Sequence, residues 1–90
     1  MKHVKIKISG KVQGVFFRAS AKDKARELEV RGFVCNEPDG SVYVEAEGEE
    51  EALNQFVAWC SKGPVGAQVG DVMVIDGVLE NHSHFEIRRK

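Results

Sequence analysis

The sequence predicts an α+β fold, a ferredoxin-like sandwich in which two helices cover one face of a mainly antiparallel sheet. Segments of alternating apolar and polar residues, typical of half-buried strands, are separated by two segments with apolar residues at helical spacing. Their order is βαββαβ with an extra final strand. Ninety residues suit a single domain, predicted to span residues 1–90.

The first strand is predicted over Val4 to Ser9, where apolar and polar side chains alternate. A helix is predicted to begin near Ala19. Its buried stripe follows helical spacing and consists of Phe17, Ala21, Ala25 and Leu28. A hairpin is then predicted, with strands at residues 33–36 and 42–47. Between them, Glu37 to Gly40 places proline second and glycine fourth, as in a type I turn.

The second helix is predicted to open at Glu49 to Glu51, because carboxylates favour the positive end of the helix dipole. Its predicted buried stripe is Leu53, Phe56, Val57 and Cys60. Gly63-Pro64 ends the helix. A strand is predicted over Val69 to Ile75, a turn at Asp76-Gly77, and a closing strand over Phe85 to Ile87.

Composition and charge describe an ordinary soluble domain with no general affinity for polyanions. The formal net charge of −1 gives no field that would gather nucleic acid or an acidic membrane. Met1 to Ser9 reads as neither a secretion signal nor a membrane span, so a cytoplasmic location is expected. Cys35 and Cys60 are expected to be free thiols, although a bridge between them stays open.

The most informative stretch is Gly10 to Arg18, GKVQGVFFR, which joins a predicted strand to a predicted helix through a turn with glycine. No Ser, Thr, Asp or Asn in Val15 to Arg18 can cap the helix, so backbone N–H groups are left over. These donors, the helix dipole and the Arg18 guanidinium suit a phosphate-sized anion. The alternative is that water satisfies the donors, Phe16 and Phe17 are core, and Arg18 is solvated.

Other phosphate chemistries do not fit the residues. A P-loop needs Ser or Thr after Gly-Lys, and Gly10-Lys11 is followed by Val12. A cysteine phosphatase needs an arginine in the same loop as its thiolate, and neither Cys35 nor Cys60 has one at the required spacing. There is no Gly-x-Ser-x-Gly nucleophile elbow.

Histidines and one asparagine complete the candidates. His82 and His84 form a possible metal pair, but without a third ligand nearby in sequence they are interpreted as exposed loop residues, and His3 is uninformative. Asn36 shares a strand face with Val34. It is either a polar amide at the end of a covered face, which needs partners, or simply the start of the turn.

Gly10 to Arg18 and Gly32 to Asn36 together resemble the two motifs of the acylphosphatase family. Further residues similar to the family are Asp39 to Val42, Lys62 to Pro64, Ala67 and Val69. The resemblance covers nearly the whole chain. It departs from the family at Cys35, where Arg or Lys is frequent, and at Glu29, where many relatives have glycine. In a left-handed cap Glu29 costs about 1 kcal/mol relative to glycine, unless the helix ends differently.

The resemblance implies hydrolysis of the carboxyl–phosphate anhydride of a small acyl phosphate, without metal, cofactor or covalent intermediate. The implied catalytic residues are Arg18 and Asn36. Arg18 would bind the phosphoryl group, and Asn36 would hold the attacking water. The implied phosphate-binding residues are Gly14, Val15, Phe16, Phe17 and Arg18. A monomer with no nucleic-acid or membrane partner is expected. The competing interpretation is a non-catalytic ligand- or RNA-binding module, although Val42 to Gly48 is acidic where an RNA-recognition sheet carries a basic-aromatic motif.

Overall fold

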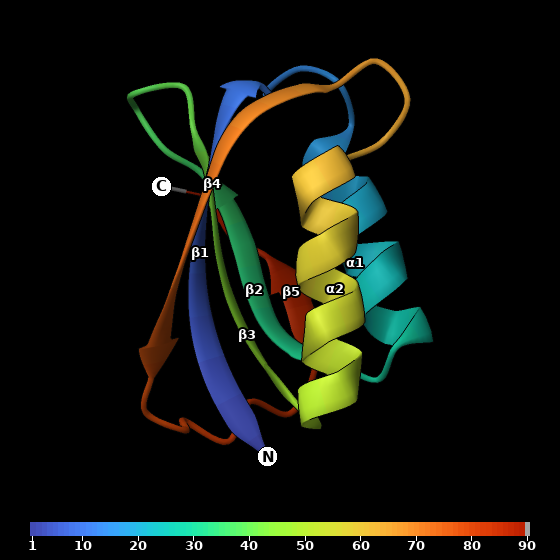
Figure 1. Ribbon diagram of the computed structural model, residues 1–90, viewed down its shortest axis with the longest axis vertical. Helices are drawn as coiled ribbons and strands as arrows, with labels where there is room; N and C mark the ends of the chain where they lie inside the picture. Colours follow the sequence, from blue (N-terminus) through green and yellow to red (C-terminus); the bar gives the residue numbers. More distant parts are fainter. Residues whose placement is uncertain (90) are drawn as a thin grey trace.

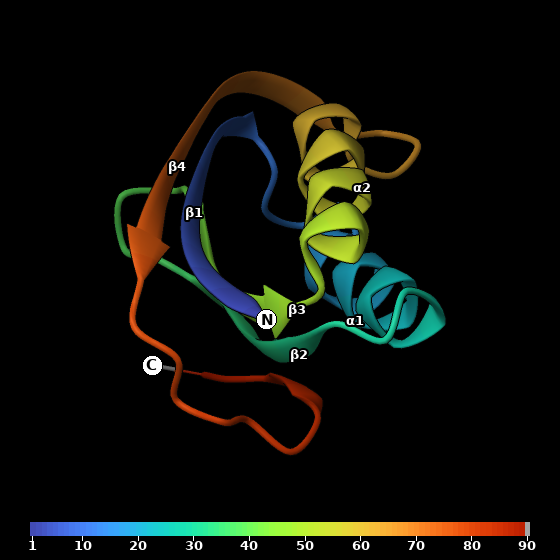
Figure 2. The ribbon, with the colours of Figure 1, turned by 60° about the horizontal axis from the view of Figure 1, so that its bottom comes forward.

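The computed structural model describes residues 1–89 and contains five strands and two helices (Figure 1). In chain order the elements are β1 (Lys2–Lys11), α1 (Phe17–Glu27), β2 (Arg31–Asn36), β3 (Val42–Gly48), α2 (Glu50–Lys62), β4 (Gln68–Gly77) and β5 (Phe85–Ile87). Both helices lie on one face of the sheet, which curves around them (Figure 2). The predicted fold class is therefore confirmed.

The sheet has the strand order β4-β1-β3-β2-β5. All neighbours are antiparallel except β2 and β5, which are parallel. The predicted hairpin joins β2 to β3, and its turn is closed by the Gly40 N–H, which donates to the Glu37 carbonyl at 3.1 Å. The predicted turn at Asp76-Gly77 is wrong, because both residues extend β4 by pairing with β1.

The core lies between the sheet and the helices. Buried helix residues, as predicted, are Phe17, Ala21, Ala25, Leu53, Phe56 and Cys60. Leu28 and Val57 are only partly buried against this cluster. Cys35 and Cys60 are both buried, and no disulfide joins them. Within residues 1–89, neither helix is long and apolar enough to cross a membrane.

Helix α1 ends with Glu29 in a left-handed conformation. The Val30 N–H donates to the Ala25 carbonyl at 2.7 Å, and the Glu29 N–H donates to the Arg26 carbonyl at 3.2 Å. This bond pair is a Schellman motif, which requires a left-handed residue just after the helix. Glu29 takes that position with φ of 59°. The chain therefore tolerates the strain and does not end the helix differently.

The connection between β4 and β5, residues 78–84, covers the sheet face away from the helices (Figure 2). It must travel from one edge of the sheet to the other, because β4 and β5 are the two edge strands. His3 is only 2% exposed beneath it. The His82 ring lies 6.2 Å from the His3 ring, with 13% of its side chain exposed. The prediction of an exposed loop histidine is therefore wrong for His82 and correct for His84, whose side chain is 64% exposed.

Glu47 on β3 fastens this connection to the sheet. Its buried carboxylate accepts hydrogen bonds from His3 Nδ1 at 2.8 Å, from the His82 N–H at 2.9 Å, and from the Glu80 N–H. Burial alone raises the pKa of Glu47, but these donors outweigh it and hold the pKa at about 2. The ionised Glu47 carboxylate therefore stabilises the fold by holding the connection against the sheet.

Replacement of Glu29 by glycine is expected to stabilise the fold by about 1 kcal/mol, because glycine adopts the left-handed conformation without a Cβ clash. Urea unfolding of wild type and Glu29→Gly measures the difference. Glu27→Gly, at the last regular position of α1, serves as the control and is expected to destabilise. A Glu29→Gly variant no more stable than wild type would show that this position is not strained.

Glu47→Gln is expected to destabilise the fold most at neutral pH. Because the folded pKa of about 2 lies below the ordinary 4.5, the carboxylate stabilises fully above pH 4.5 and loses this contribution as pH falls toward 2. The difference in unfolding free energy between wild type and variant should therefore narrow in acid. Urea unfolding between about pH 7 and pH 3 measures it. A difference independent of pH would contradict this role.

Candidate active site

The loop from β1 into α1 has an uncommon backbone. Val12 is buried and anchors the loop, whereas Gly14 has φ of 76° and Phe16 has φ of 61°. A left-handed conformation is rare for a bulky residue and is found preferentially at functional sites. The Phe16 side chain is 83% exposed, while Phe17 is buried and starts the helix, earlier than the predicted Ala19.

The start of α1 leaves backbone donors over. Within residues 1–89, no side chain caps this helix. The first internal bond runs from the Ser20 N–H to the Phe16 carbonyl at 3.0 Å, so the N–H groups before Ser20 receive no acceptor from the helix. The positive end of the helix dipole lies at the same place. The predicted uncapped start is confirmed, and it suits an anion.

Arg18 and Asn36 face a common cavity at this helix start. The cavity has a volume of about 300 Å³ and is lined by Val12, Gly14, Phe16, Phe17, Arg18, Ala19, Asn36, Ile87 and Arg89. A second cavity of about 270 Å³ is lined by Arg18, Asn36, Glu37, Pro38, Arg88 and Arg89. Of the residues predicted for the site, only Val15 is missing from the linings, because its side chain packs against the core. The structure thus brings the two sequence motifs together.

The cavity is rich in positive charge. Arg18 is half-buried on the first turn of α1, and within residues 1–89 no carboxylate forms an ion pair with it. Arg89 adds a second guanidinium to both linings. Arg88 lines the second cavity, but its guanidinium is already paired with Glu86 at 2.8 Å and lies over the Phe33 ring, 4.0 Å from the ring centroid. Arg18 is therefore available to an anionic ligand.

Asn36 ends β2 and pairs with Val42 across the hairpin. The amide of Gln13 donates to the Glu37 carbonyl at 2.8 Å and to the Ser41 carbonyl at 2.9 Å. These bonds tie the β1–α1 loop to the hairpin turn and so fix Asn36 relative to the helix start. No local sequence pattern indicates this role of Gln13, because its partners are 24 and 28 residues away.

Arg89 was also missed. The sequence signal for it is the basic run Arg88-Arg89-Lys90 after the last predicted strand. The run alone does not indicate a site residue. Only the pairing of β5 with β2 places Arg89 beside Asn36 in the cavity.

Comparison with known proteins identifies the family. A family model described as acylphosphatase matches residues 4–87. An acylphosphatase of Anaeromyxobacter sp. strain Fw109-5 is 55% identical over 77% of this chain and 74% of its own length. One from Thermotoga maritima is 43% identical over 98% of both chains. The crystal structure of the acylphosphatase from Bacillus subtilis is 37% identical, covers 98% of this chain and 99% of its own, and superposes with a TM-score of 0.95.

The chain belongs to the acylphosphatase family. The predicted family and the prediction of an enzyme are confirmed, and a non-catalytic binding module is set aside. The individual roles of Arg18 and Asn36 stay predictions.

Proposed function

We propose that this protein hydrolyses acyl phosphates, and that Arg18 and Asn36 carry the reaction. Water would cleave the carboxyl–phosphate anhydride to give a carboxylate and inorganic phosphate. The observation that carries the proposal is that the two motif residues line one cavity at an uncapped helix start. The names of the relatives point to the same substrate class.

The loop and Arg18 bind the phosphoryl group in this mechanism. The N–H groups of Gly14 to Phe17 and the guanidinium of Arg18 donate hydrogen bonds to the non-bridging phosphate oxygens. Phosphoryl transfer depends mainly on positioning and on stabilising charge at these oxygens. A guanidinium offers two parallel donors to a phosphate, which fixes its orientation as well as its charge. Arg89 adds positive charge at the rim.

Asn36 orients the attacking water. An amide is too weak a base to remove a proton from water at neutral pH, so its role is to hold the water in line with the bond that breaks. The proton passes to an oxygen of the substrate's own phosphate. The leaving carboxylate has a conjugate acid with a pKa of roughly 4 to 5, so it departs without a proton donor.

This chemistry needs neither a metal ion nor an organic cofactor in the reaction. A good leaving group and fixed hydrogen-bond donors replace the charge stabilisation that a metal would supply. Both site residues come from one chain. We also propose that residues 1–90 form a single catalytic domain, and that it acts as a cytoplasmic monomer without nucleic-acid or membrane partners.

Arg18→Lys is expected to keep the fold but to lower kcat/KM for a synthetic acyl phosphate by about a hundredfold or more. A lysine point charge cannot reproduce two-point contact with phosphate. Arg26→Lys, an exposed position on the same helix, is the matched control and should remain at wild-type activity. Near-normal turnover by Arg18→Lys would refute the assignment. An ordinary phosphate ester, assayed in parallel, tests the preference for the anhydride.

Asn36→Ala is expected to lower kcat by about a hundredfold while inhibition by inorganic phosphate stays within about threefold of wild type. The reason is that Asn36 orients water and the loop binds phosphate. Steady-state kinetics with phosphate as inhibitor separates the two effects. Asn54→Ala, exposed on α2, is the control. If phosphate binding falls and kcat stays, Asn36 binds substrate and does not orient water.

A further inference from the structure

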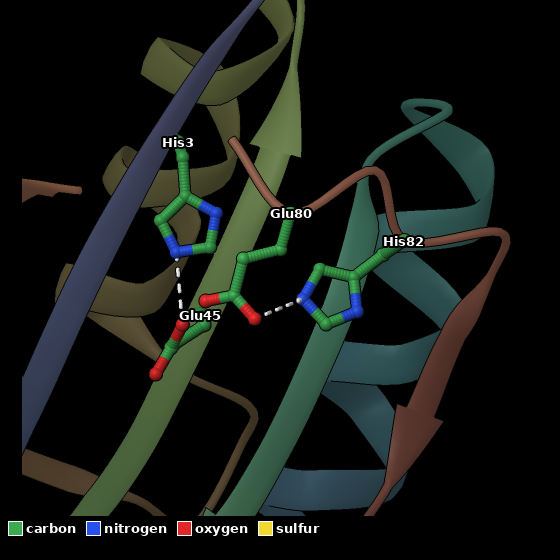
Figure 3. A group of neighbouring side chains, drawn as sticks. All are labelled: His3, Glu45, Glu80 and His82. Atoms are coloured by element: carbon green, nitrogen blue, oxygen red, sulfur yellow. Dashed lines mark hydrogen bonds and ion pairs between the residues drawn. The ribbon is translucent and has the colours of Figure 1, made fainter. Parts of the chain in front are cut away.

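A second group of chemically active side chains lies at the end of the molecule opposite the β1–α1 loop. It consists of His3, Glu45, Glu80 and His82, and one nitrogen or oxygen atom from each lies within 4.8 Å of the others. Figure 3 shows the Glu80 carboxylate between the two imidazole rings, with the Glu45 carboxylate next to His3. No role in acyl phosphate hydrolysis follows from this position.

The fold assembles this group from three distant segments. His3 lies on β1 and pairs with Glu47 of β3. Glu45 lies two residues before Glu47 on the same strand, so His3 and Glu45 are on the same face of the sheet, the face away from the helices. Glu80 and His82 come from the connection between β4 and β5, which crosses that face. The group therefore exists only when the connection is docked.

His82 has an unsatisfied nitrogen pointing into the group. Its Nε2 is buried and, within residues 1–89, has no hydrogen-bond partner. The Glu80 Oε1 lies 3.9 Å from this nitrogen, which is within ion-pair distance but too far for a hydrogen bond (Figure 3). Buried polar atoms nearly always have a partner, so an orphaned imidazole nitrogen facing carboxylates calls for a ligand.

The surroundings orient His3 and Glu45 as ligands. Glu47 accepts a hydrogen bond from His3 Nδ1 at 2.8 Å, which turns His3 Nε2 toward Glu45 Oε1 at 2.9 Å. A carboxylate on the far nitrogen of a histidine is the usual outer partner of a metal-bound imidazole. Tyr43 donates to Glu45 Oε2 at 2.8 Å and leaves Oε1 for the group.

We propose that His3, Glu45, Glu80 and His82 bind one divalent transition-metal ion of the Zn²⁺ class. Two imidazoles and two carboxylates make a closed four-ligand set that suits Zn²⁺, with ligand bonds of about 2.0–2.2 Å. The ion takes the place of the proton between His3 and Glu45, and that proton leaves to solvent.

Binding requires the ligand atoms to draw together, since a tetrahedral ion sets them about 3.4 Å apart. The Glu80 side chain is 56% exposed and can move. With all four positions filled by protein, the ion serves to fasten residues 78–84 to the sheet and not to bind substrate. The site is independent of the proposed reaction, because Asn36 is level with Ile8 across the sheet, five residues along β1 from His3.

Calorimetric titration of the untagged, chelator-treated chain with Zn²⁺ tests the site. Wild type is expected to bind one ion per chain, and its Tm should rise with Zn²⁺ concentration. His82→Ala and Glu80→Gln, both on the connection, should each weaken binding by about tenfold or more. His84→Ala removes an exposed histidine two residues away and should bind as wild type does. Ca²⁺, which prefers all-oxygen ligands, should not displace Zn²⁺.

The proposal is overturned if wild type shows no saturable binding of one Zn²⁺, or if His82→Ala and Glu80→Gln bind as tightly as His84→Ala. Displacement by Ca²⁺ would overturn the assignment to the Zn²⁺ class. The rate of acyl phosphate hydrolysis should be the same with chelator and with Zn²⁺. A rate that falls with chelator and returns with Zn²⁺ would overturn the structural role of the ion.

Discussion

At the start of α1, backbone N–H groups are left without a hydrogen-bond acceptor from the helix or from a capping side chain. Phe16 takes a left-handed conformation, the helix begins without a side-chain cap, and Arg18 has no carboxylate partner in the part of the chain that the structure describes. The first two features disfavour the free protein slightly. In the proposed mechanism, one phosphate-sized anion accepts hydrogen bonds from these N–H groups and pairs with Arg18.

The sheet topology then decides what stands beside this anion site. The hairpin turn after β2 is tied to the β1–α1 loop by Gln13, so Asn36 is held at a fixed place relative to the start of α1. β5 returns beside β2 and brings Arg89 to the same cavity. The connection that makes this return possible has to cross the outer sheet face, where it buries His3 and aligns the second group of side chains.

Much of this could be predicted from local sequence. Apolar residues at strand or helix spacing predict all seven elements, because an element that is buried on one face repeats its apolar residues with the period of that element. The predictions failed where burial came from a distant segment. His3 stands near the terminus and His82 in a polar loop, and nothing local shows that residues 78–84 fold over β1 and β3. Gln13 and Arg89 were missed for the same reason, since each acts on residues brought near only by the fold.

The most direct test of the central claim is a titration of the ¹⁵N-labelled protein with inorganic phosphate, followed by amide resonances. The anion site predicts saturable shifts concentrated at the N–H groups of Gly14 to Arg18 and at the Asn36 side-chain amide. Shifts that spread over the surface lysines, or a loop that does not respond at saturating phosphate, would contradict it.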